Sequence, residues 1–150
     1  MTVYFTSHSG TAGTTIQAGA NDVRIMSVEL TETGGRPVCG WIYVGTPGAS
    51  SMSGGSTQVP KPAKSGAPAS LATARIGGAS ISGTTRLCGS WAVTSSSSGI
   101  GTTDPRAITA VATWIPMGDL ILPPGGLFYI QGTVTSAVIW FEETRLSWSY

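Results

Sequence analysis

The apolar residues of this chain come in short runs, and this pattern constrains the fold more than any other feature of the sequence. The runs are rich in Val, Ile, Thr and aromatic residues, and each ends at Gly, Pro or Ser. A surface helix would repeat apolar residues every three or four positions, and such a repeat is nearly absent. The sequence therefore predicts an all-β fold, a jelly-roll-like antiparallel β-sandwich of about eight strands.

Ten runs, which make eight to ten strands, follow one another along the chain with turns between them. They span residues 3–6, 14–17, 23–33, 37–46, 79–82, 85–94, 107–115, 120–122, 127–134 and 137–148. Gly34 and Gly35, between the third and fourth runs, predict a hairpin turn. The 150 residues contain no linker with folded material on both sides, so we expect a single domain over residues 1–150.

Alternation of side chains along two runs assigns their faces. In residues 23–33, we expect Met26, Val28 and Leu30 on one face of the strand. In the last run, Trp140 and Phe141 are neighbours that must point to opposite faces, so both faces are apolar. Such a strand is either central in a sandwich or covered by a second subunit. The residues of the candidate subunit interface are Trp140, Phe141, Trp148 and Tyr150.

Residues 45–70 are interpreted as a long loop or arm. This segment holds five Gly, four Pro, six Ser and no aromatic residue, and it contains Lys61 and Lys64, the only lysines of the chain. Long loops without structure are uncommon in compact domains and are usually functional or disordered. The segment is either a surface loop or an extended arm that lies along a neighbouring protein in polyproline-II form. The candidate contact residues of this arm are Pro60, Lys61, Pro62, Lys64 and Pro68.

Charge and hydropathy exclude several kinds of partner. The eight basic and seven acidic residues are scattered singly and give a net charge of +1. No cluster of Lys and Arg could neutralise several phosphates at once, so we expect no nucleic-acid partner. No run approaches the roughly 18 apolar residues of a membrane span, and the start lacks the pattern of a signal peptide. We therefore expect a protein made in the cytoplasm that has no membrane partner.

The two cysteines, Cys39 and Cys88, are too few for a disulfide framework. Both lie in apolar β-like runs, where a free Cys behaves as a small hydrophobic residue, so we expect them to be unpaired. The surrounding sequences resemble each other, because each has an Arg, a Cys-Gly pair and then a Trp, Trp41 or Trp91. This similarity fits two core strands as well as it fits an internal repeat.

Side chains that could perform catalysis are scarce. His8 is the only histidine and has no carboxylate near it in sequence, and its neighbours Ser7 and Ser9 point to the opposite face of a strand. Glu142 and Glu143 form the only acidic pair, and alternation separates them in the same way. The single His and two Cys have no spacing typical of a zinc site. The sequence thus predicts no enzyme, no catalytic residue, no metal and no cofactor.

The aromatic residues could instead form a platform for sugars. Such platforms occur in β-sandwich carbohydrate-binding modules. Most of the aromatic residues lie inside apolar runs, where a position in the core is the usual one. A carbohydrate-binding module remains an alternative to a structural role. The aromatic residues considered for it are Trp41, Tyr43, Trp91, Trp114, Tyr129, Trp140, Trp148 and Tyr150.

The last part of the sequence resembles a known class of proteins. Residues 121–133 read ILPPGGLFYIQGT and are followed by VIWFEE at 138–143, while ANDVRI at 20–25 leads to YVGT at 43–46. This arrangement is similar to small jelly-roll proteins from the virions of tailed bacteriophages, the head-decoration or cement proteins. The similarity covers about half of the chain as a pattern. The Pro-Gly-Gly bend also suits any sharp corner between strands.

The resemblance implies a non-enzymatic structural virion protein, a homotrimer on the surface of a phage capsid. Its partner would be the major capsid protein, whose neighbouring subunits it would hold together. Such a protein stabilises the assembled shell because it binds only that state. Affinity would come from aromatic anchors and an extended arm, repeated three times in the trimer. A tail, baseplate or head-fibre module is the alternative within the virion.

Overall fold

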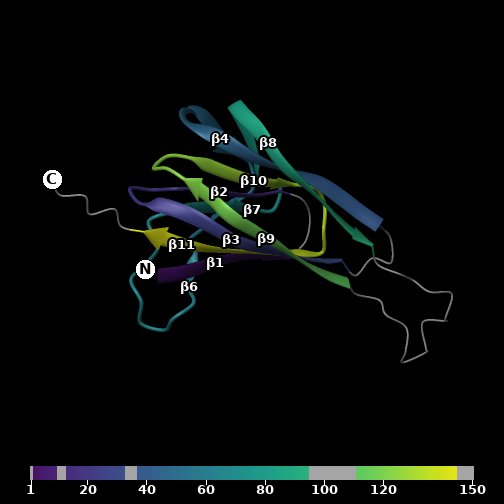
Figure 1. Ribbon diagram of the computed structural model, residues 1–150, viewed down its shortest axis with the longest axis horizontal. Coiled ribbons are helices and arrows are strands. Elements are labelled where there is room, and N and C mark those ends of the chain that lie inside the picture. The colour runs from purple at the N-terminus through teal and green to yellow at the C-terminus, as the bar shows by residue number, and fades with distance from the viewer. Residues whose placement is uncertain (1, 10–12, 33–36, 95–110, 145–150) are drawn as a thin grey trace.

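The computed structural model describes residues 2–9, 13–32, 37–94 and 111–144, and all regular elements within them are β-strands (Figure 1). The predicted all-β sandwich is confirmed: the strands form two antiparallel sheets. The strands are β1 (Thr2–Ser9), β2 (Thr14–Gln17), β3 (Asp22–Glu32), β4 (Pro37–Ser53), β5 (Ser56–Gln58), β6 (Lys61–Pro62), β7 (Thr73–Ile76), β8 (Ser80–Thr94), β9 (Val111–Leu122), β10 (Leu127–Gln131) and β11 (Ser136–Thr144).

The long strands pair as an antiparallel ribbon that is folded back on itself. β1 pairs with β11, β2 with β10, β3 with β9 and β4 with β8. The additional pairs β11–β3 and β10–β4 gather this ribbon into two sheets. The strand order is β6-β1-β11-β3-β9 in the first sheet and β5-β7-β2-β10-β4-β8 in the second sheet. This is the strand order of an eight-stranded jelly roll, with β5, β6 and β7 added at the sheet edges.

The core lies between the two sheets and is largely apolar, although polar side chains such as Thr6 are also fully buried. Along β10, Phe128 and Ile130 are buried in the core, whereas the alternate residues Tyr129 and Gln131 point away from the other sheet. The largest fully buried side chains come from both sheets, so the core ties the two layers together. They are Phe128, Phe141, Ile16, Ile25, Leu30, Ile42, Leu127 and Ile139.

Two of the predicted strand boundaries are wrong, because the pairing register shifts there within one strand and the strand then continues. The predicted runs 79–82 and 85–94 belong to the single strand β8, and the end of 107–115 joins 120–122 in β9. Gly83 in β8 and Gly118 in β9 have φ angles of 90° and 59°, which glycine adopts without strain. Residues 107–110 lie outside the described part of the chain.

The predicted hairpin between the third and fourth runs is also wrong. β3 pairs with β11 and β9, whereas β4 pairs with β10 and β8, so the two strands lie in different sheets. The connection therefore crosses from one layer to the other, as the wrapped ribbon requires. Gly34 and Gly35 themselves lie outside the described residues.

A bulge in β3 changes which of its residues face the core. Ile25 is opposite Phe141 of β11 and Ser27 is opposite Trp140, so Met26 is an extra residue at this point. Val23 and Ile25 are fully buried before the bulge, and Val28 and Leu30 after it. Met26 is only partly buried and does not share a face with Val28 and Leu30 as strict alternation predicted.

Residues 45–70 are not a continuous loop. β4 continues through this segment to Ser53: its pairing with β8 is interrupted at residues 46–49 and resumes at Ser50. β5 and β6 add to β7 and β1. These stretches are held by main-chain pairing and by small polar contacts such as Ser51 Oγ to Ser82 Oγ at 3.3 Å. Because pairing of this kind needs no apolar side chains, the hydrophobic pattern gave no sign of these strands.

The two glycines of the Cys-Gly pairs give a test of packing in the second sheet. A Cβ on Gly40 would lie 1.8 Å from the Gln131 carbonyl oxygen and 2.8 Å from the Trp91 ring, whereas a Cβ on Gly89 meets nothing closer than 3.7 Å. Gly40→Ala should lower the free energy of unfolding by about 2 kcal/mol or more. Gly89→Ala should leave it unchanged or raise it by up to about 1 kcal/mol. Urea denaturation measures both, and equal effects would contradict the packing at Gly40.

Candidate functional site

The segment that carries both lysines is fixed along the edge of the first sheet. In β6, Lys61 lies opposite Phe5 and Pro62 lies opposite Tyr4 of β1. The Ala63 amide then donates to the Val3 carbonyl at 2.8 Å, which extends this pairing by one residue. The chain leaves the sheet here, and the Ala67 amide closes a turn by donating to the Lys64 carbonyl at 3.2 Å.

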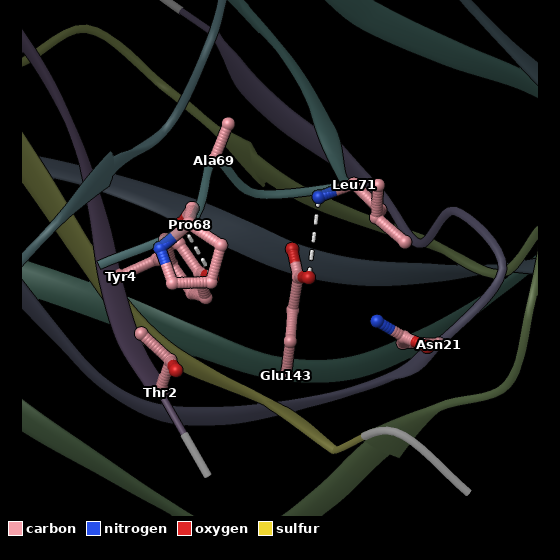
Figure 2. A pocket seen from close by; sticks show the side chains of 7 residues that line it. All are labelled: Thr2, Tyr4, Asn21, Pro68, Ala69, Leu71 and Glu143. Atoms are coloured by element: carbon pink, nitrogen blue, oxygen red, sulfur yellow. Dashed lines mark hydrogen bonds between the residues drawn. The ribbon is translucent and has the colours of Figure 1, made fainter. Parts of the chain in front are cut away.

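The far end of this turn returns to the sheet at a small pocket of about 300 Å³ (Figure 2). The Tyr4 hydroxyl donates to the Pro68 carbonyl at 2.9 Å. Glu143 of β11 points toward the same segment, and its carboxylate accepts hydrogen bonds from the amides of Leu71 at 3.2 Å and Ala72 at 3.1 Å. The Ser70 hydroxyl donates to the same carboxylate.

The buried carboxylate of Glu143 has a structural role. It is only 7% exposed, and its two oxygens accept from three donors on residues 70–72. A charged group at this depth is stable only when such donors surround it. Glu143 therefore fastens residues 70–72 to β11, and its oxygens are occupied by the chain itself.

The residues between these attachments form a loop that we call the lysine loop, residues 61–68. Its ends are held by the β6–β1 pairing and by the Tyr4 and Glu143 hydrogen bonds. Lys61, Lys64, Ser65 and Gly66 are exposed, whereas Pro60 immediately before the loop is buried. Of the predicted arm residues, Pro60 is therefore an anchor in the domain and Pro62 is half-buried, whereas Lys61, Lys64 and Pro68 are exposed.

The predicted interface residues of β11 have different surroundings. Phe141 is fully buried and stacks with Tyr4 at a ring-centroid distance of 5.8 Å, so its side chain is not accessible to a second subunit. Trp140 lies on the outer face, packs against Phe5 at 5.0 Å and donates from Nε1 to Glu29 at 2.8 Å. Trp148 and Tyr150 lie outside the described residues.

The other carboxylates and the histidine are placed separately. Glu142 meets Arg24 at 3.5 Å, and the Glu32 carboxylate accepts from the Thr135 amide at 3.2 Å. His8 lies in β1 opposite Ala137. Among the described residues, no three or more His, Cys, Asp or Glu side chains gather where they could hold a metal ion.

The two cysteines are free and exposed, in contrast to the expected small hydrophobic positions. Cys39 lies opposite Ala92, four residues along β8 from Cys88. Four strand residues span about 13 Å, which exceeds the roughly 7 Å that a disulfide allows between Cα atoms. Partial burial raises the pKa of the Cys88 thiol, and the nearby Arg86 acts in the opposite direction.

The outer face of the second sheet carries two adjacent rows of side chains that we call the aromatic shelf. Trp41 of β4 lies between Gln131 of β10 and Ser90 of β8 in one row. Tyr43 lies between Tyr129 and Leu87 in the next row. The sequence showed these aromatic residues but not their neighbours, because the rows depend on the β4–β10 and β4–β8 registers.

Trp41 is the most exposed aromatic side chain of the shelf, at 50%. It lines a groove of about 570 Å³ together with residues 39–40, 90–92 and 131–132. The second row is more covered: the rings of Tyr43 and Tyr129 are stacked with centroids 6.1 Å apart. Burial, followed by the presence of Tyr43, raises the pKa of Tyr129.

Comparison with known proteins gave no match to any family model, curated protein or solved structure. The described part of the chain contains no helix with the length and apolar character that a membrane crossing requires.

The role of Glu143 can be tested against its neighbour in β11. Glu143→Gln replaces one acceptor oxygen by an NH₂ group, which faces donors on residues 70–72 that then lack an acceptor. We expect the free energy of unfolding to fall by about 1–3 kcal/mol. Glu142 is equally buried at 8%, but its carboxylate meets only the half-exposed Arg24, at 3.5 Å. Glu142→Gln removes the charge and keeps an acceptor oxygen for this contact, so it should cost less than about 1 kcal/mol. Urea denaturation measures the loss of stability in both variants, and equal losses would contradict the structural role assigned to Glu143.

Proposed function

We propose that this chain is a non-enzymatic structural protein that docks on the assembled shell of a tailed phage through its lysine loop. The observation that carries the proposal is the fixation of both ends of a loop that exposes the only two lysines of the chain. The resemblance to head-decoration proteins supports the choice of partner, the major capsid protein.

Fixation of the loop favours binding because less conformational freedom is lost when the partner is engaged. The β6–β1 pairing and the Glu143 hydrogen bonds order the backbone on either side of Lys64 before any partner arrives. Prolines at 60, 62 and 68 restrict the same segment further. A pre-ordered loop converts more of its contact energy into affinity than a flexible arm does.

The charge of the loop suggests the chemistry of the surface that it would meet. Lys61 and Lys64 project from a segment that has no acidic residue between positions 45 and 70. An acidic patch on the shell would complement them, although each exposed ion pair contributes only about 0–1 kcal/mol. Avidity therefore matters, because three loops in one assembly multiply these small contributions.

The outer face of the first sheet supports a homotrimer in this proposal. Phe5 and Trp140 are in contact there and only partly buried, and Val3 and Val138 lie on the same two strands with the same partial exposure. A patch of large apolar side chains on a sheet face is typical of protein contacts. Phe141 takes no part in this contact, since it is buried in its own core.

A trimer predicts a definite mass in solution. Light scattering at micromolar concentration should give three times the chain mass of 15.3 kDa. Trp140→Ala should shift this mass toward that of the monomer, because it removes the largest side chain of the proposed contact. Leu87→Ala, an exposed apolar residue of the other sheet, is the control and should remain trimeric. A wild-type protein with the mass of a monomer would contradict the trimer.

Docking through the lysine loop is tested by binding to empty, expanded capsids of the corresponding phage. The double variant Lys61→Ala, Lys64→Ala should bind about ten- to a hundredfold more weakly at low salt, and the difference should shrink as salt rises. Arg86→Ala removes an exposed cation from β8 and should bind as the wild type does. A second variant of the lysine loop replaces residues 64–67 by Gly and Ser and leaves β6 and Pro68 unchanged. Unchanged affinity in both loop variants would show that the loop does not face the shell.

A further inference from the structure

We propose that the groove at Trp41 binds the ring of an uncharged sugar. This binding activity goes beyond docking on a shell and uses a different part of the molecule, because Trp41 lies in the second sheet and the lysine loop lies at the edge of the first. The proposal depends on four properties of the groove: a half-exposed indole, polar neighbours in the same row, a rigid floor and a neutral lining.

The first row of the aromatic shelf combines a stacking surface with hydrogen-bonding groups. Trp41 is 50% exposed, and it is flanked directly by the exposed Gln131 and Ser90 on the neighbouring strands. Side chains directly opposite each other in a sheet lie about 4.5–5.5 Å apart at their Cβ atoms. An amide offers two donors and an acceptor, and a hydroxyl offers both functions, so a ring stacked on the indole would have partners for its hydroxyls on either side.

The floor of the groove is rigid, so the platform is formed before a ligand arrives. The buried Trp91 donates from Nε1 to the Gln131 carbonyl at 3.0 Å, which fixes the strand next to Trp41. Gly40 and Gly132 lie against the Trp91 indole, because a Cβ on either glycine would come within 2.8 Å of a Trp91 ring atom. Binding to this surface therefore requires little ordering of the protein.

The lining of the groove selects against charged ligands. Its residues are Cys39, Gly40, Trp41, Ser90, Trp91, Ala92, Gln131 and Gly132, and none of them carries a charge. The groove volume of about 570 Å³ lies within the range of small-molecule sites, about 300–1,000 Å³. A neutral ring with apolar faces and polar edges, which is the character of a pyranose, matches this lining better than an acidic sugar or a phosphate does.

The position of Trp41 in the sheet argues against a peptide strand as the occupant. β4 is paired with β10 on one side and with β8 on the other at this residue. Its main-chain groups are therefore already engaged, and an incoming strand could not extend the sheet here as it does at an exposed edge. Recognition at Trp41 must come from the side chains, which favours a ring that stacks.

The experiment titrates the full-length protein with neutral hexasaccharides, namely cellohexaose, maltohexaose, mannohexaose and chitohexaose, and follows intrinsic tryptophan fluorescence and heat. We expect saturable binding of at least one of them below about 10 mM. Trp41→Ala should weaken this binding by about ten- to a hundredfold, in line with the loss caused by replacing an aromatic side chain on which a nucleic-acid base stacks. Gln131→Leu should also weaken it, because the side-chain amide is lost while the main-chain carbonyl stays.

Two controls separate the groove from the rest of the surface. Leu87→Ala changes an equally exposed apolar side chain in the next row, 51% against 50%, and should keep the wild-type affinity. A sugar bound in the groove should protect Cys39 from alkylation by iodoacetamide but leave Cys88 reactive, since only Cys39 lines the groove. The proposal is overturned if no neutral hexasaccharide binds, if Trp41→Ala binds as tightly as the wild type, or if hexagalacturonate binds better than every neutral sugar.

Discussion

Strand β11 determines where the important groups of this protein lie. It is paired on both sides, with β1 and with β3, so its alternating side chains are held on two fixed faces. Phe141 enters the core, Trp140 contacts Phe5 on the outside, and Glu143 reaches the segment that closes the lysine loop. A shift of one residue in this pairing would exchange the faces and disconnect the loop from the domain.

Much of the fold was predictable because its long strands bury alternate apolar side chains. The runs that became β1–β4 and β8–β11 were visible in the sequence, and so was the apolar character of both faces of β11. The hairpin at Gly34 and Gly35 was not a sound inference, because a local turn signal does not show to which sheet the next strand belongs. The short strands β5, β6 and β7 were missed because main-chain pairing holds them and their few apolar side chains form too short a pattern.

The candidate sites were predictable only in part, because their contacts depend on how distant segments pair in the folded chain. Lys61 and Lys64 stood out as the only lysines, but their fixation depends on a glutamate more than 70 residues away, and nothing in the local sequence indicates that contact. Trp41 stood out as one aromatic residue among many. Its neighbours Gln131 and Ser90 follow from the strand register alone, so the groove became recognisable only in the folded chain.

The two proposed surfaces lie on different sheets, so one molecule could use both at once: the lysine loop toward a shell, and the Trp41 groove toward a sugar. We propose that the lysine loop is the part of the molecule that meets the shell. Electron cryo-microscopy of the particle with this protein bound tests it most directly. We expect residues 61–68 to contact the capsid surface while Trp41 stays open to solvent. A particle in which this loop points into solvent would contradict docking through the lysine loop.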